Sequence, residues 1–146
     1  MDLADVPDVA RLAGEFAQHM RALGDSTPLC LDADALVRDG FGERPAFEGI
    51  VALRDAEIVG YLLAHDGYDT DAACRVLFVC DLFVRQTARG HGVGAALMRE
   101  ATDIAITRGA AHLVWTVATN NTAARQFYER LGARVEDSVH IMYKSV

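Results

Sequence analysis

The chain has 146 residues, of which 51% are hydrophobic and 24% charged, values typical of one globular domain and not of a disordered segment. We therefore expect a single domain over residues 1–146. The net charge of −7 argues against a nucleic-acid-binding protein, because such proteins usually present a basic surface.

The first part of the chain predicts two helices. Apolar residues recur at helical spacing from Val9 to Leu23, with Asp5 as the candidate N-cap and Gly24 just past the end. A shorter helix is expected over residues 32–38, before a stretch that contains two glycines.

The hydrophobic period changes at Phe47. Residues 47–53 and 58–63 are short apolar runs joined by a polar turn, which predicts a β-hairpin. Residues 67–73 are polar and rich in turn formers, and the strongly apolar residues 76–84 predict a central strand.

The remainder predicts a long helix over residues 93–108, a strand over 112–117, a helix over 121–131, and short strands at Val135 and over 139–143. This order of elements indicates a mixed α/β (α+β) domain with one central sheet flanked by helices.

The sequence contains no metal motif and no membrane segment. Its three cysteines and five histidines are spaced irregularly and match neither a disulfide framework nor a set of metal ligands. The N-terminus lacks the basic stretch and apolar run of a signal peptide, and no apolar run approaches the roughly 20 residues that span a bilayer. We expect a cytoplasmic protein with reduced thiols.

A glycine-rich turn, residues 84–94, joins the predicted central strand to the long helix and carries the strongest chemical signal. Glycines let the backbone approach a ligand closely, and the helix start adds free N–H groups and a positive partial charge. Such a turn suits a phosphate or pyrophosphate, with Arg89 as a nearby cation. A turn used only for packing is the structural alternative.

Two other phosphate-binding motifs were compared with this turn. The Gly-Lys-Ser/Thr ending of a P-loop is absent. Gly90 to Ala95 fits the dinucleotide pattern G-x-G-x-x-G/A, but the match lies in mid-chain and no acidic residue ends the next strand.

Two segments resemble motifs of the GNAT acetyltransferase superfamily. Arg89, Gly92 and Gly94 match its motif R/Q-x-x-G-x-G/A, and residues 121–133, NTAARQFYERLGA, match N-x-x-A-x-x-F-Y-E-x-L-G-F/A. The resemblance runs in order over about residues 47–145. It implies the GNAT fold, with a mixed, mostly antiparallel sheet, in which the family's first strand is missing or very short here.

The resemblance implies acetyl-CoA as the acetyl donor and an amine as the acceptor. The strand edge at residues 82–84 would pair with the amide-rich arm of CoA, and the turn would hold its pyrophosphate. The residues expected to bind this cofactor are Leu82, Phe83, Val84, Arg89, Gly90, His91, Gly92, Val93, Gly94, Ala95, Asn121 and Ala124.

Tyr128 and Asp81 are the candidate catalytic residues. Tyr128 shares a helix face with Asn121 and Ala124, and the resemblance places it near the thioester sulfur, where a phenol can protonate the leaving thiolate. The structural alternative is a core or rim position. Asp81 precedes the donor-binding segment and is the candidate base, directly or through water; otherwise it is a hydrogen-bonded residue that holds the strands apart.

The chain looks closest to the diamine and thialysine acetyltransferases, through residues 81–84, Trp115-x-Val117 and residues 131–133. That branch usually carries Glu where this chain has Cys80, which weakens the expectation of a polyamine substrate. A nucleophilic Cys80 is a further alternative, and the lack of an adjacent His argues against it. Cys80 and Asp81 should face opposite ways unless a bulge intervenes.

We expect a small cationic amine as the acceptor, no nucleic-acid or membrane partner, and, as is common in this fold, a homodimer. Surplus carboxylates near the expected acceptor side favour a cation, namely Asp32, Asp34, Asp66, Asp69 and Asp71. Acetylation of a protein N-terminus or lysine is the alternative among enzymes, and a CoA-binding module without turnover is the alternative outside them.

Overall fold

The computed structural model of the chain describes residues 1–142 and 144. Its backbone contacts divide it into two compact units, Met1–Thr116 and Val117–Val146. The expected single domain therefore stays a prediction. The first unit contains η1 (Leu3–Asp5), α1 (Val6–Ala22), α2 (Ala33–Gly40), β1 (Glu48–Arg54), β2 (Glu57–Asp69), β3 (Cys74–Val84), η2 (Gln86–Ala88), α3 (Val93–Thr107) and β4 (Ala110–Trp115). The second unit contains α4 (Thr122–Arg130).

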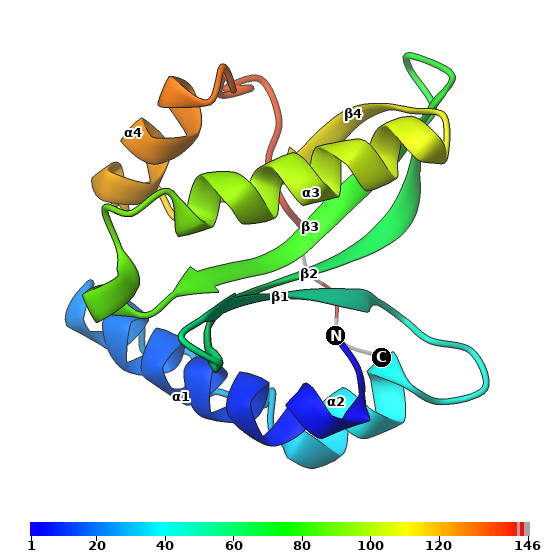
Figure 1. The fold of residues 1–146 in the computed structure, drawn as a ribbon. Helices are drawn as coiled ribbons and strands as arrows, with labels where there is room; N and C mark the ends of the chain where they lie inside the picture. Colours follow the sequence, from blue (N-terminus) through cyan, green and yellow to red (C-terminus); the bar gives the residue numbers. More distant parts are fainter. Residues whose placement is uncertain (143, 145–146) are drawn as a thin grey trace. The chain divides into compact units, whose positions relative to one another are not determined.

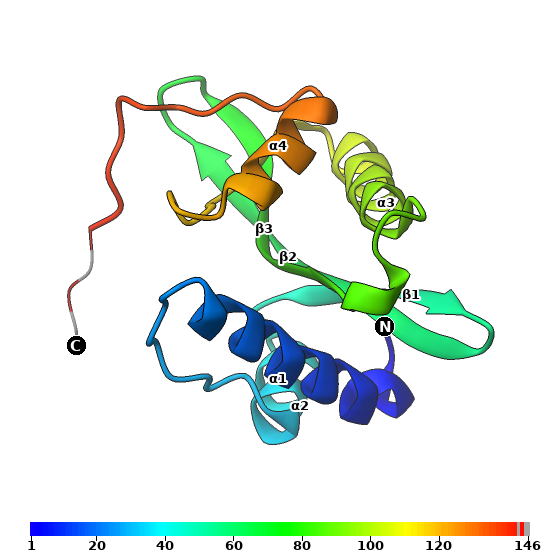
Figure 2. The ribbon, with the colours of Figure 1, turned by 90° about the vertical axis from the view of Figure 1, so that its left-hand side faces the viewer.

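The four strands of the first unit form one sheet in the order β1-β2-β3-β4. The pairs β1–β2 and β2–β3 are antiparallel, and β3–β4 is parallel. Helices α1 and α2 lie on one face of this sheet and α3 lies on the other (Figures 1 and 2). The predicted mixed, mostly antiparallel sheet flanked by helices is confirmed. As expected, no strand precedes α1 among the described residues.

Helix α1 forms because apolar residues recur every three or four positions along it. The buried ones are Val6, Val9, Leu12, Ala13 and Ala17. The expected cap is different in detail, because the Asp5 side chain makes no cap bond to α1. Its carboxylate instead accepts from the Asp2 N–H within the preceding turn η1. The helix is followed by Gly24 at φ +91°, a conformation that glycine adopts without strain.

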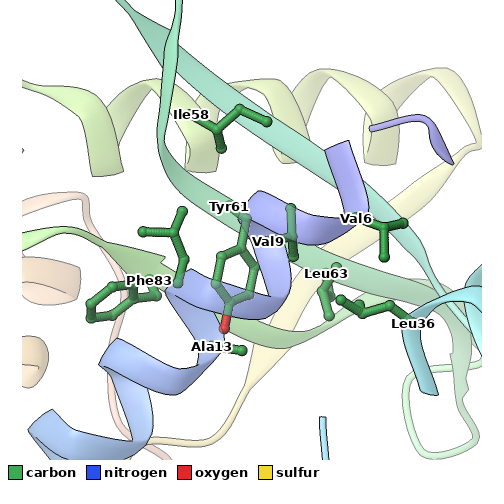
Figure 3. Packing of buried hydrophobic residues seen from close by; sticks show 9 residues of the cluster. Val6, Val9, Ala13, Leu36, Ile58, Tyr61, Leu63 and Phe83 are labelled. Carbon is green, nitrogen blue, oxygen red and sulfur yellow. The ribbon is translucent and has the colours of Figure 1, made fainter. Parts of the chain in front are cut away.

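The core between the sheet and helices α1 and α2 is apolar except for one hydroxyl group. Its buried members are Val6, Val9, Leu12, Ala13, Leu36, Ile58, Tyr61, Leu63 and Phe83 (Figure 3). Burying a side chain the size of Leu12 contributes about 1.5–3 kcal/mol to folding. On the other face, α3 buries Leu97, Met98, Ala101 and Ala105, and its small alanines permit a close approach.

Two strand predictions differ from the structure. Strand β2 continues to Asp69 instead of ending at residue 63, because its polar residues stay paired with β3 as far as Asp69 opposite Cys74. The described residues of the predicted terminal strands, Val135 and 139–142, are in no strand. No described residue pairs with them, and Met142 is 89% exposed. Tyr143 lies outside the described residues.

Candidate active site

The glycine turn leaves the start of α3 open. Gly90 and Gly92 have φ values of +80° and +79°, and a Cβ at either residue would meet nothing within 4 Å. These glycines therefore serve backbone conformation and not close packing. The first helical bond runs from the Ala96 N–H to the Gly92 carbonyl, and no side chain in the described part of the chain caps this helix. The N–H groups of residues 93–95 thus remain available to an anion.

Arg89 ties this turn to the preceding strand. Its Nε donates to the Val84 carbonyl oxygen at 2.8 Å, and its guanidinium carbon lies 5.4 Å from the ring centroid of Phe83. Burial lowers the pKa of Arg89 from its usual value, and a guanidinium still stays charged near neutral pH. His91 turns back on the same turn, with Nδ1 2.9 Å from the Arg89 carbonyl oxygen. A fixed cation therefore lies in the turn that opens α3.

Strand β3 extends past the end of its partner β4. The β3–β4 pairing ends at Val79 opposite Trp115, whereas β3 stays paired with β2 as far as Val84 opposite Gly60. The Arg85 N–H donates to the Val59 carbonyl, and residues alternate along an antiparallel pair. Leu82 and Val84 therefore direct their backbone groups away from β2. This edge suits an extended, amide-bearing ligand.

A β-bulge at Cys80 sets the orientation of the next residue. Leu63 is opposite Asp81 and Ala64 is opposite Val79, so Cys80 is the extra residue on β3. The β-bulge that was the stated exception to the alternation of Cys80 and Asp81 is thus present. Residues directly opposite each other share a sheet face, so Asp81 lies on the face of Leu63 and Tyr61, where α1 and α2 pack.

Asp81 accepts a hydrogen bond from the buried hydroxyl of Tyr61, with 2.5 Å between the phenol oxygen and Oδ2. Burial raises the pKa of Asp81 from 3.8 to about 6, while the Tyr61 hydroxyl and the Leu82 N–H act in the opposite direction. Burial and the adjacent carboxylate raise the pKa of Tyr61 well above its usual value, so the phenol keeps its proton. A carboxylate with such a pKa can both take up and release a proton near neutral pH.

The Cys80 thiol is exposed but not activated. Its Sγ lies 3.9 Å from the Phe78 carbonyl oxygen. Partial burial of this otherwise exposed residue and the charge of Asp81 raise the pKa of Cys80, which keeps the thiol protonated. A nucleophilic cysteine needs the opposite shift, so the geometry argues against the alternative of an acetyl-cysteine intermediate.

In the second unit, the candidate residues share one face of α4. Asn121, Ala124, Phe127 and Tyr128 are half-buried, and the residues between them are exposed. The Asn121 side-chain oxygen accepts from the Ala124 N–H at 3.1 Å and so caps the helix. The rings of Phe127 and Tyr128 lie 5.1 Å apart. Asp81 and the turn belong to the first unit and Tyr128 to the second, and each group is described within its own unit.

Some of the carboxylates expected to attract a cationic acceptor already have hydrogen-bond or ion-pair partners within the protein. Asp32 caps α2 by accepting from the Ala35 N–H. Asp66 pairs with Arg108 at 3.1 Å, and Asp69 accepts from two backbone N–H groups of its own turn. This leaves Asp34 and Asp71 of the original set, so the charge argument rests on fewer carboxylates than the composition suggested.

Sequence reasoning missed Tyr61. It lies in the apolar run from Ile58 to Leu63, which marked it only as part of a strand. A sequence signal existed, because a tyrosine in a buried run must place its hydroxyl against an acceptor. Elsewhere in the described residues no three His, Cys, Asp or Glu side chains gather as a metal site. No helix found there combines the length and apolar character of a bilayer span.

The sequence matches the family model described as "Acetyltransferase (GNAT) family" over residues 16–133. The thialysine N-epsilon-acetyltransferase of Bos taurus is 29% identical over 138 residues, which cover 89% of this chain and 79% of that protein. The spermidine/spermine N(1)-acetyltransferase-like protein 1 of Homo sapiens is 30% identical over 139 residues, 90% of this chain but 19% of that protein.

Among solved structures, the ribosomal-protein-alanine N-acetyltransferase of Brucella melitensis superposes with a TM-score of 0.77 at 23% identity. The match covers 99% of this chain and 96% of that one. At this identity the likeness shows a shared fold. The family match, by contrast, includes the glycine turn, Asp81 and Tyr128.

Proposed function

Because this chain belongs to the GNAT acetyltransferase family and is an acyl-CoA-dependent N-acetyltransferase, we propose that it acetylates the primary amine of a small cationic molecule. The observation that carries the donor side is the uncapped start of α3 behind Gly90 and Gly92, beside the projecting edge of β3. The names of the bovine and human relatives, which refer to thialysine and to spermidine and spermine, support an amine of this class.

The residues of the turn fit the donor used by this family, acetyl-CoA. The N–H groups of residues 93–95 and the Arg89 cation would hold the pyrophosphate. The Leu82 carbonyl and the Val84 N–H would face the amide-bearing arm, whereas the Leu82 N–H bonds to the Asp81 carboxylate and the Val84 carbonyl accepts from Arg89. His91, Asn121 and Ala124 stay predicted contacts, and Asn121 already uses its side-chain oxygen to cap α4.

Asp81 and Tyr128 each transfer a proton in the proposed reaction. Asp81 takes a proton from the acceptor ammonium, directly or through one water, and leaves a neutral amine. The amine nitrogen forms a bond to the acetyl carbonyl carbon as the bond from that carbon to the CoA sulfur breaks. Tyr128 gives its phenolic proton to the departing thiolate. The second nitrogen proton passes to solvent as the amide forms, and the products are the acetylated amine and the CoA thiol. Solvent then takes the proton from Asp81 and returns one to Tyr128.

Two further predictions stand beside this proposal. The cytoplasm remains the expected compartment, and a homodimer remains the expected assembly. Acetylation of a protein N-terminus or lysine is the alternative activity, and a CoA-binding module without turnover is the non-enzymatic alternative.

The test is release of the CoA thiol from acetyl-CoA in the presence of an amine panel. Polyamines, lysine analogues and aminoglycosides represent small cations, and peptides with a free N-terminus or an internal lysine represent protein acceptors. We expect acceleration by at least one small amine, with its acetylated product seen by mass spectrometry. If only the peptides accelerate thiol release, the small-amine proposal is wrong and acetylation of proteins takes its place. Failure of CoA to shift the melting temperature would remove the donor site itself.

A further inference from the structure

The environment of Tyr61 makes its hydroxyl exceptional in the core. The side chain has 0% exposure, and Figure 3 shows its ring among Val9, Ala13 and Phe83. A phenol buried among such neighbours costs free energy unless its O–H finds an acceptor. Its acceptor is Oδ2 of Asp81, at 2.5 Å.

The geometry of β3 makes this contact specific. Tyr61 is opposite Phe83, and Leu63 is opposite Asp81, so all four residues belong to one sheet face. The bulge at Cys80 is what turns Asp81 to that face. The contact therefore depends on a local irregularity of the strand and not on regular alternation.

We propose that Tyr61 is the positioning residue of Asp81, holding Oδ2 so that the other carboxylate oxygen receives the proton of the acceptor amine. This rests on the proposed function, in which Asp81 is the base. Fixing one oxygen limits rotation of the carboxylate, and preorganisation of this kind is how a neighbouring residue supports a catalytic group.

The groups around Asp81 define what a change at Tyr61 would do. The Tyr61 hydroxyl approaches from β2, and the Leu82 N–H, a second donor to the carboxylate, and the Cys80 thiol are its neighbours on β3. Helices α1 and α2 contribute apolar side chains to this face, among them Val9, Ala13 and Leu36. Loss of the Tyr61 hydroxyl removes a donor that favours the ionised carboxylate, so the proton should become harder to remove from Asp81.

The experiment compares the pH dependence of kcat/KM in Tyr61→Phe, Asp81→Asn, the double variant and the wild type. Tyr68→Phe is the matched control, because Tyr68 lies on the same strand β2 and is 63% exposed. In Tyr61→Phe we expect the acidic limb to move up by about 0.5–1 pH unit, with kcat/KM about threefold to tenfold lower near neutral pH and nearly restored at high pH. Adding Tyr61→Phe to Asp81→Asn should have little further effect.

The outcomes distinguish the positioning role of Tyr61 from the assignment of Asp81 as the base. If Asp81→Asn is impaired but Tyr61→Phe keeps the wild-type limb, the positioning role of Tyr61 is wrong and the base survives. If Asp81→Asn keeps the wild-type activity and limb, the assignment of the base fails. Should Tyr61→Phe not fold, 3-fluorotyrosine at position 61 replaces it. Its more acidic hydroxyl should move the limb down, and an unmoved limb overturns the inference.

Discussion

The side chain of Arg89 donates from Nε to the carbonyl oxygen of Val84 at 2.8 Å, and so joins the last residue of β3 to the turn that opens α3. The strand edge and the helix start are the two parts of the proposed donor site. Arg89 is thus a structural link between them as well as a cation beside the phosphates.

We predict that Arg89→Ala raises the KM for acetyl-CoA about tenfold or more, because a charge-assisted contact and the link to β3 are both lost. Arg89→Lys should restore only part of the affinity, since an ammonium cannot reproduce the guanidinium fork. Steady-state kinetics measure both. Arg75→Ala, an exposed arginine at the other end of β3, is the control. An unchanged KM in Arg89→Ala would contradict the donor site.

Gly92→Ala should destabilise the protein by about 1–2 kcal/mol, because an L side chain is strained at φ +79°. Nothing lies within 4 Å of its new Cβ, so the cost is conformational and Gly92→Asn should be milder. Gly14→Ala, in the interior of α1 with equally open space, should instead stabilise by about 0.5–1 kcal/mol. Urea unfolding gives all three values. Equal effects at the two glycines would refute the argument from φ.

Tyr128→Phe should lower kcat about 100-fold, because the phenyl ring keeps the shape of the side chain and loses the proton donor. The basic limb of the kcat profile, which reports loss of the phenolic proton, should disappear. Tyr68→Phe serves again as the control of matched chemistry. A kcat within twofold of wild type across the pH range would remove Tyr128 as the acid.

Cys80→Ala should retain kcat within about threefold, because a thiol with a raised pKa is a poor nucleophile. Mass spectrometry of the wild-type protein mixed with acetyl-CoA alone should detect no acetylated Cys80. Loss of turnover together with such an adduct would establish a two-step transfer through the cysteine and displace direct attack.

The pH dependence of stability gives a test of Asp81 that needs no substrate. Its pKa is about 6 in the folded protein and 3.8 as the reference value, so the folded state binds more protons between these pH values. Stability from this group is complete below pH 3.8 and is lost as the pH rises through about 6. Between about pH 4 and 7, the free energy of unfolding of wild type should fall by about 2 kcal/mol relative to Asp81→Asn. A constant difference between the two proteins would show that Asp81 is not perturbed.

Long periodic elements were predictable from the residues. The apolar spacing of α1, the glycines that bound α3 and the apolar run of β3 each reflect local chemistry that the final structure keeps. The end of β2 was not predictable in this way. Its residues up to Asp69 are polar, and they stay extended because β3 pairs with them across the turn.

The residues of the candidate site also differ in whether local sequence predicts their roles. Arg89 and the glycines could be found because their role depends on the turn itself. The contact of Tyr61 with Asp81 could not, because it depends on strand register and on one extra residue in β3. A shift of register by one residue moves every side chain of a strand to the other face of the sheet, and the local sequence does not predict such a shift.

The bulge at Cys80 also divides β3 into two stretches whose side chains run in opposite phase. Residues 74–79 follow one alternation, which buries Leu77 and Val79, and residues 81–84 follow the other. If Cys80 were instead paired with Leu63 in a regular ladder, residues 81–84 would shift by one position and Asp81 would turn to the opposite face of the sheet. The bulge therefore fixes the face on which Asp81 lies, whichever side chains residues 74–79 carry.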